Sequence, residues 1–245
     1  MLLPFARRAL SAVDDAAAEF SARSALLRGQ LRVGSGGGIE NTAVPALLGR
    51  FRAKYPGIDV HLTEATSAPL VAMVLDGELH AAVIARTDSS PPATISWAPM
   101  FTDRLVAVFD GGQFRIDGDP APLTELAAHP IISYPASSAL RARVDAVAQQ
   151  ESAPLRVNYV ANDVRMQIAL ARQRVGVALC ARTDPALDDV APLTVREITP
   201  QISFEKVLIW RNDITPSAPL RAFLSLWRDH RTHSPADPQS GLRTG

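Results

Sequence analysis

The sequence lacks several features that would point to particular classes of protein. It has a single cysteine, Cys180, in 245 residues, so neither a disulfide framework nor a zinc site built from several thiolates is available. Lysine and arginine together number 25, as do aspartate and glutamate. This balance gives no basic excess of the kind that marks direct binding to nucleic acid. The single cysteine also leads us to expect a reduced, intracellular setting.

Long hydrophobic runs are also missing. No stretch approaches the roughly 18 consecutive apolar residues of a transmembrane helix. The amino-terminal segment MLLPFARRALSAVDDAAAEF differs from a secretory signal, because acidic residues interrupt its apolar part and its arginines come after the first apolar residues. We therefore expect no membrane partner and a cytoplasmic location. The lack of signal-like features in this segment argues against a periplasmic protein.

Residues 3–28 have a helical pattern with a distinctive period. Pro4 suits a first helical turn, and Gly29 suits a helix end. Apolar residues recur at alternating spacings of three and four, which is the 3.5-residue period of a coiled-coil seam. This stripe also fits a helix packed on its own domain. We favour a dimerisation helix, because the stripe is narrower than a globular helix needs; its candidate contacts are Leu3, Leu10, Val13, Ala17, Phe20 and Leu27.

After Gly29 the chain alternates between strand and helix patterns, which indicates an α/β fold. Two clusters of about three βα units are separated near residues 101–104 and again near 198–204. The last strand and helix are surplus to the second cluster, so we expect them to return to the first. The result is two lobes joined by two crossovers. The predicted divisions are a helix at 1–29, lobe I at 30–101 and 202–231, lobe II at 102–201, and a disordered tail at 232–245.

The stretch GSGGG at residues 34–38 follows the first expected strand and raises the question of a nucleotide site. A dinucleotide fingerprint would need glycine at position 39, which is Ile39, and Pro45 places the helix start well beyond the glycines. No G-K-[S/T] follows, so a phosphate-binding P-loop is excluded. A nucleophile elbow around Ser35 would need glycine at position 33, which is Val33. An NAD(P)-dependent oxidoreductase is thus a weak alternative.

Metal and catalytic sites have little support. The five histidines are scattered, and His230 and His233 lie at the end of the last expected helix. Cys180 stands in an apolar strand, where a buried, inert thiol is the usual outcome. We therefore expect no enzyme activity, no metal and no cofactor.

What remains is a binding cleft at the carboxyl ends of the strands, where open α/β sheets bind ligands. Ser35 and the amides of Gly36–Gly38 can hold a carboxylate, and Thr66 and Ser67 add hydroxyl groups. Asn162 stands at a helix start in the other lobe. Each residue alone suits a cap or turn, but together they favour a site for a small anion.

These features also resemble a known family. The run LLGRFRAKYPGIDVHLTEATSAPLVAMVLDGELHAAVIA is similar to the effector domain of LysR-type transcriptional regulators, with its F-x-x-x-Y-P pattern and its later L-x-x-G. LLPFARRALSAVDDAAAEFSA resembles the linker helix of these regulators, and LLRGQLRVGS resembles the hinge and first strand. The likeness runs from about residue 1 to residue 230.

The resemblance implies a two-lobed fold like that of type-2 periplasmic binding proteins. It implies a small-molecule effector, often a carboxylate or another anion, bound between the lobes of a homodimer or homotetramer. By position, the effector site includes Ser35, Gly36, Gly37, Gly38, Thr66, Ser67, Tyr134 and Asn162.

The family begins with a winged helix-turn-helix of roughly 60 residues that binds DNA, and this chain starts at the linker helix. We therefore expect a truncated regulator, a regulator with a misassigned start, or a natural effector-domain fragment. In each case it would reach DNA only through a winged-helix domain or a full-length partner. A solute-binding protein of the same fold, serving a transporter, is the main alternative.

Overall fold

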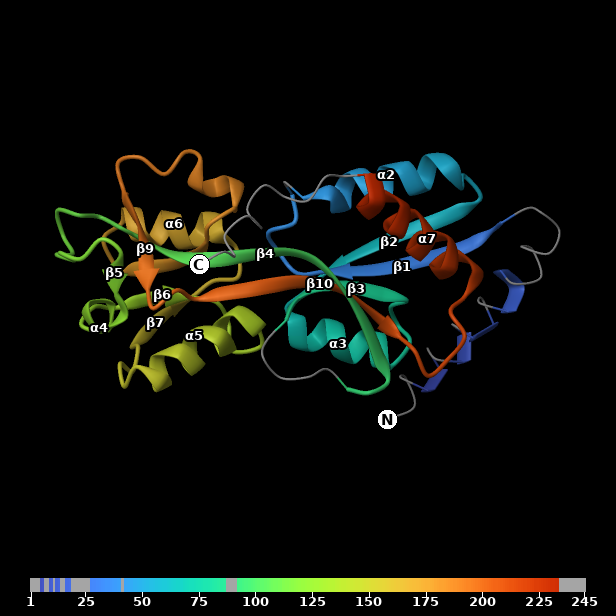
Figure 1. Ribbon diagram of the computed structural model, residues 1–245, viewed down its shortest axis with the longest axis horizontal. Helices are drawn as coiled ribbons and strands as arrows, with labels where there is room; N and C mark the ends of the chain where they lie inside the picture. The colour runs from blue at the N-terminus through green and yellow to red at the C-terminus, as the bar shows by residue number, and fades with distance from the viewer. Residues whose placement is uncertain are drawn as a thin grey trace, which may run out of the picture.

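The computed structural model describes residues 5–6, 9–10, 12–13, 16–18, 27–40, 42–86 and 92–233. Figure 1 shows two α/β units side by side, joined by two long strands that run between them. The main strand order is β2-β1-β3-β10-β4-β8-β6-β7. The first unit lies on the right of Figure 1 and the second on the left.

Lobe I is built on a parallel core of three strands. These are β1 (Gly29–Ser35), β2 (Ile58–Glu64) and β3 (Ala81–Arg86), with β10 (Ser203–Arg211) antiparallel to β3. Helices α2 (Ala43–Lys54) and α7 (Ala218–His233) cover one face, and α3 (Ser67–Leu75) covers the other (Figure 1). Because both faces are covered, β3 is apolar and buried from Ala81 to Ala85, as strands of buried parallel sheets are, and only Arg86 at its end is charged.

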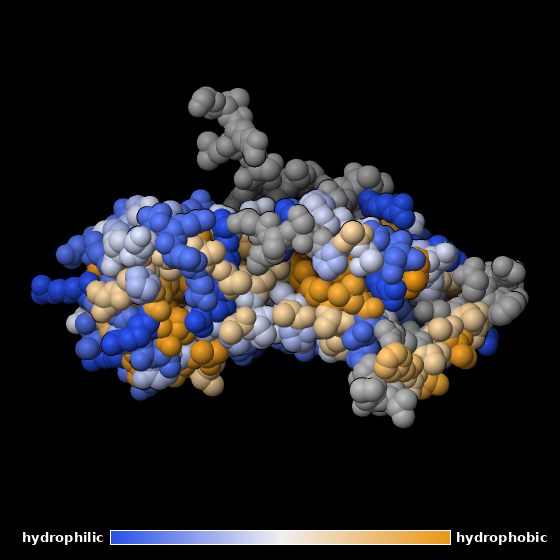
Figure 2. All heavy atoms as spheres, turned by 90° about the horizontal axis from the view of Figure 1, so that it is seen from below, coloured by the Kyte–Doolittle hydropathy of each residue, from blue (hydrophilic) through white to orange (hydrophobic). Residues whose placement is uncertain are grey.

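Helix α3 carries no charged residue. It buries Leu70 and Val74 against the sheet, and it leaves Ala68, Pro69 and Ala72 exposed. Figure 2 shows hydrophobic side chains gathered on this underside of lobe I.

Lobe II has a second sheet and its own core. Its inner strands are β8 (Val177–Ala181) and β6 (Ile131–Ser133), with β7 (Val157–Val160) at one edge and β9 (Thr194–Thr199) paired to β4. The short strand β5 (Ala121–Pro122) pairs with β9. Helix α6 lies on one face, with α4 and α5 on the other (Figure 1). These helices and the short 3-10 helix η1 span Leu123–Leu126 (α4), Ala139–Gln150 (α5), Val164–Arg172 (α6) and Pro185–Leu187 (η1).

The two crossovers are made by β4 (Ile95–Phe109) and by the chain that enters β10. From Ile95 to Arg104, β4 pairs with β10 in lobe I; from Leu105 onward it pairs with β8 and β9 in lobe II. The largely apolar run RLVAVF predicts a strand at 104–109, whereas the structure has one strand of 15 residues. Continuous pairing with β10, through a bulge at Lys206 and Val207, explains the extension. The α/β fold with two crossovers is confirmed.

The amino-terminal segment is helical at the residues that the structure describes there. Leu10 and Val13 are 67% and 66% exposed, so this part of the apolar stripe is not covered by its own lobe. Leu27 differs from the expectation, because it packs partly buried against the core of lobe I. Leu3 and Phe20 lie outside the described residues. Helix α7 continues to His233, into the segment expected to be disordered, and the rest of that tail also lies outside the described residues.

Candidate functional site

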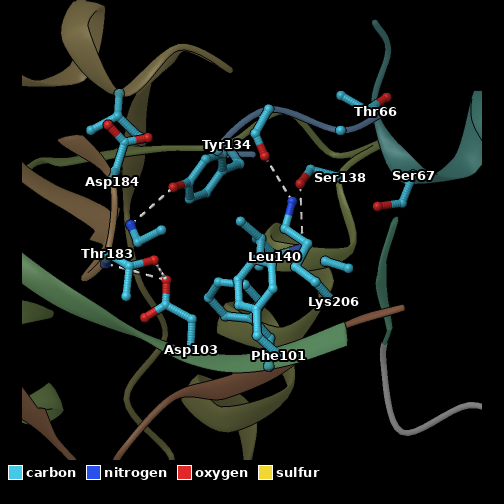
Figure 3. A pocket seen from close by; sticks show the side chains of 17 residues that line it. Thr66, Ser67, Phe101, Asp103, Tyr134, Ser138, Leu140, Thr183, Asp184 and Lys206 are labelled. Carbon is cyan, nitrogen blue, oxygen red and sulfur yellow. Dashed lines mark hydrogen bonds between the residues drawn. The ribbon is translucent and has the colours of Figure 1, made fainter. Parts of the chain in front are cut away.

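A small cavity of about 40 Å³ lies between the lobes, at the carboxyl ends of β1 and β6 and beside the crossover strands. Lobe I contributes the glycine loop and the start of α3. The crossover strands contribute Phe101, Asp103, Phe204 and Lys206. Figure 3 shows these side chains converging on Tyr134 from both lobes. The lining residues are Gly36, Gly37, Gly38, Thr66, Ser67, Ala85, Phe101, Asp103, Tyr134, Ser138, Leu140, Val164, Ala181, Thr183, Asp184, Phe204 and Lys206.

The glycine loop brings backbone close to the other lobe. The Gly36 N–H is already used, because it donates to the Val83 carbonyl at 2.9 Å. Gly38 has φ of +74°, a conformation that favours glycine. A Cβ on Gly36 would lie 3.4 Å from the Lys206 Nζ, and one on Gly38 would lie 3.8 Å from the Asp184 Oδ2. The loop therefore passes between a cationic and an anionic side chain.

Lys206 is the buried cation of the site and is only 5% exposed. Its Nζ donates to the Gly37 carbonyl at 2.7 Å. An ammonium group has three N–H donors, and the other two meet no acceptor among the described residues. Burial lowers the pKa of Lys206 to about 8, while Asp103 and other acidic groups oppose this shift. At neutral pH the ammonium is therefore mostly charged.

Both carboxylate oxygens of Asp103 accept hydrogen bonds from the protein. Its Oδ2 accepts from the Thr183 hydroxyl at 2.7 Å and from the Thr183 N–H at 3.3 Å, and its Oδ1 accepts from the Arg104 N–H at 2.7 Å. The carboxylate is thus held by the crossover and by the loop after β8. Its main effect on the site is to help keep Lys206 charged.

Asp184 differs from Asp103, because only one of its oxygens is used. Its Oδ1 accepts from the Ala186 N–H at 2.9 Å and caps the short helix η1. Its Oδ2 accepts no hydrogen bond from the described residues. Burial raises the pKa of the Asp184 carboxyl group. This oxygen is available to a ligand in the cavity.

Tyr134 and Ser138 form the lobe II wall. The Tyr134 hydroxyl accepts from the Ala181 N–H at 3.1 Å, and Ser138 caps α5 by accepting from the Leu140 N–H at 3.2 Å. Burial raises the pKa of Tyr134 well above its ordinary value, so the hydroxyl stays protonated. It retains a proton that it can donate.

Two hydrogen bonds join the lobes beside the cavity. The Thr66 hydroxyl donates to the Ser137 hydroxyl at 2.9 Å, and the Ala68 N–H donates to the Ser137 carbonyl at 3.2 Å. Both come from the start of α3 in lobe I and end on the loop between β6 and α5 in lobe II. The structure therefore represents an arrangement in which the lobes touch on this side.

Of the residues expected from the sequence, Ser35 and Asn162 do not line the cavity. Ser35 is 2% exposed, and its hydroxyl donates to the Gly36 carbonyl at 2.7 Å, so it supports the loop from within. Asn162 lies across the cleft near Gly37, where its Nδ2 would be 3.9 Å from an added Cβ. The other expected residues, Gly36, Gly37, Gly38, Thr66, Ser67 and Tyr134, line the cavity.

The sequence reasoning missed the charged residues of the site. In FEKVLIW, Lys206 directly follows Glu205, so charge alone does not single it out. The one local signal that it faces inward is its spacing of two residues from the apolar Phe204 and Leu208, since alternate residues of a strand share a face. No local pattern identifies Asp184 as a site residue, because its neighbour in space, Gly38, is far away in the sequence.

Cys180 is fully buried, and its thiol donates to the Gln167 Oε1 at 3.3 Å. Burial raises the pKa of the thiol strongly, as suits an inert structural cysteine. Within the described part of the chain there is no cluster of metal-binding side chains, and no helix is long and apolar enough to cross a membrane.

The family model described as the LysR substrate binding domain matches residues 24–232, which is most of the chain. This chain belongs to that family. The transcriptional regulator IlvR of Caulobacter vibrioides is 29% identical over 175 residues, covering 70% of this chain and 58% of its own length. BbuR of Bordetella bronchiseptica is 25% identical over 182 residues, covering 74% of this chain and 55% of that regulator. The chain thus spans just over half the length of these curated relatives.

Solved structures support the same assignment. The C-terminal domain of a probable LysR family regulator from Rhodococcus is 26% identical, with a TM-score of 0.66, covering 81% of this chain and 98% of that one. The effector-binding domain of QuiR, solved with shikimate, is 16% identical and has a TM-score of 0.73. The match covers 84% of this chain and 99% of that one, and at this identity it supports the fold alone. The LysR resemblance and the type-2 periplasmic-binding-like fold are confirmed. This is a family of ligand-binding regulatory domains and not of enzymes.

Proposed function

We propose that this LysR effector domain binds a small anion in the cavity between its lobes and that Lys206 supplies the opposite charge. The observation that carries the proposal is the buried Lys206 ammonium group, which lines the cavity, donates one hydrogen bond to Gly37 and has two further donors without an acceptor among the described residues. A buried charge is costly unless it is paired. A ligand carboxylate would pair it. The shikimate bound by QuiR is such a carboxylate.

The remaining contacts would come from both lobes. Thr66 and Ser67 add hydroxyl groups from lobe I, and Tyr134 can donate its proton from lobe II. A ligand that touches both lobes favours the closed arrangement over the open one, and so shifts their populations. A coupling free energy of about 1–3 kcal/mol is typical of such a switch.

The chain offers a matched pair of variants for testing the site. Its two lysines are Lys54, exposed on α2, and Lys206. A panel of small carboxylates that includes shikimate is titrated calorimetrically into the wild-type chain and into Lys206→Met and Lys54→Met. We expect at least one ligand whose affinity falls at least tenfold in Lys206→Met and is unchanged in Lys54→Met. If every carboxylate that binds is insensitive to Lys206→Met, the proposed site is wrong.

We further propose the assembly in which the domain works. The exposed residues Leu10 and Val13 support pairing of the amino-terminal helix in a homodimer, or in a homotetramer built from such pairs. Control of transcription would then pass to DNA through a winged-helix domain ahead of this helix or in a full-length partner. The lobe boundaries proposed are 30–101 with 202–231, and 102–201. A cytoplasmic location follows from this role and is tested by cell fractionation.

A further inference from the structure

The acidic side of the cavity calls for an explanation beyond anion binding. Asp103 and Asp184 both line it, and a carboxylate near a bound anion would weaken binding by repulsion. Asp103 is satisfied by the protein, as its contacts with Thr183 and Arg104 show. Asp184 is not, because its Oδ2 faces the cavity without a donor among the described residues. The Oδ1 of Asp184 caps η1, whereas its Oδ2 has no partner that would explain it within the described residues, and a ligand can supply one.

The positions of the two charges suggest that role. Lys206 meets the glycine loop at the Gly37 carbonyl, and Asp184 approaches the same loop at Gly38. Figure 3 shows Asp184 and Lys206 on opposite sides of Tyr134 in the pocket. The cavity thus carries a cation at one end and an anion at the other. A plain carboxylate uses only the Lys206 end, and a dianion would meet repulsion from Asp184.

We infer that the effector is a small zwitterion, with a carboxylate bound by Lys206 and a protonated amine bound by Asp184. The inference rests on the proposed function, since it specifies the ligand of the same cavity. A protonated amine would donate to the Asp184 Oδ2, completing the pairing of both charges. The positive charge of the amine would also favour the ionised carboxylate, which opposes the effect of the burial that raises the pKa of Asp184.

The size and walls of the cavity limit the rest of the ligand. Its volume of about 40 Å³ leaves room for a molecule of few atoms unless the lobes move apart. Apart from the charged groups, the walls combine the hydroxyl residues already described with the apolar side chains of Phe101, Leu140, Val164 and Phe204. An amino acid with a short chain or a small apolar side chain has these properties. The ligand class is therefore a small amino acid, because a sugar acid or a phosphate ester has no amine to pair with Asp184.

The test uses sets of three related compounds. Each set contains a zwitterion, the acid that lacks its amine and the amine that lacks its carboxylate. One set is L-valine, 3-methylbutanoate and 2-methylpropylamine; the other is 4-aminobutanoate, butanoate and propylamine. Each compound is titrated into the wild-type chain and into the Asp184→Asn and Lys206→Met variants. Asp184→Asn keeps the oxygen that caps η1 while removing the charge. Asp188→Asn, at an exposed aspartate on the same turn, is the matched control.

We expect the wild-type chain to bind one or more of the zwitterions at least about tenfold more tightly than the matching acid or amine. This ratio corresponds to the free energy of one hydrogen bond to a charged group. Asp184→Asn should remove this preference without weakening the acid, and Lys206→Met should weaken zwitterion and acid alike. Asp188→Asn should leave the preference unchanged.

The inference is overturned if no zwitterion is preferred to its acid, or if Asp184→Asn leaves the preference intact. The failure of the inference and the failure of the proposed function can be told apart. If carboxylates bind in a Lys206-dependent way without any preference for an amine, the anion site stands and the zwitterion is wrong. If no carboxylate of either panel depends on Lys206, the anion site itself is wrong.

Discussion

Replacing Lys206 with methionine should make the domain more stable while it weakens effector binding. The pKa of the Lys206 ammonium group is lowered from 10.5 to about 8 by burial. At about 1.4 kcal/mol for each pKa unit, holding the charged form in the folded state costs about 3 kcal/mol. Methionine removes this cost, and it also removes the hydrogen bond to Gly37, which contributes about 1 kcal/mol. The net expectation is a gain of about 2 kcal/mol at pH 7.

The sign of the pH dependence follows from the same pKa values. Below pH 8 the lysine is protonated in both the folded and the unfolded chain, and the cost of burying the charge is fully present. Between about pH 8 and 10.5 the folded chain gives up the proton first, so the free energy of unfolding rises with pH. The advantage of Lys206→Met should therefore shrink across this window, while Lys54→Met should track the wild-type chain.

Thermal and urea unfolding of the wild-type chain, Lys206→Met and Lys54→Met at several pH values measure this effect. For a domain of this size, about 2 kcal/mol corresponds to a rise in Tm of about 4–8 °C. A Lys206→Met variant that is less stable than the wild-type chain at pH 7 would refute the reasoning. So would a stability difference that is unchanged at pH 10.

The other predictions concern the lobe contact, the helix and the cysteine. Thr66→Val removes the hydrogen bond to Ser137 across the cleft, so effector affinity should fall about fivefold in titration calorimetry; unchanged affinity would show that closure does not use this contact. Replacing the exposed Leu10 and Val13 by aspartate should lower the sedimenting mass, and retention of the wild-type mass would rule out pairing through this stripe. The buried Cys180 should react with a thiol reagent only after denaturation, and rapid labelling of the folded chain would contradict its burial.

Much of the fold follows from local patterns in the sequence. The run IDVHLTE, directly after the helix-breaking pair Pro56-Gly57, predicts a strand at 58–64, and β2 has these bounds. The return of the last strand and helix to lobe I could be predicted because they were surplus to the second cluster. The full length of β4 could not, because its first half is held by pairing with β10, which lies about 100 residues later in the chain.

Only part of the site could be predicted, because some of its residues come together from distant parts of the sequence. The glycine loop and the hydroxyl residues before α3 have local signatures, and they line the cavity. Ser35 shares that signature, but its side chain turns toward the Gly36 carbonyl, and no sequence pattern specifies this rotamer. Lys206 and Asp184 are brought to the loop by the crossover and by η1. Their joint position depends on the tertiary fold.

The central claim is that a charged Lys206 binds the effector, and the pH dependence of affinity tests it most directly. The tightest-binding carboxylate without an amine is titrated into the wild-type chain from pH 6 to pH 9.5. Because the ligand needs the protonated ammonium group, the account predicts constant affinity below pH 8 and a fall of about tenfold for each pH unit well above it. Affinity that stays constant to pH 9.5 would contradict the claim.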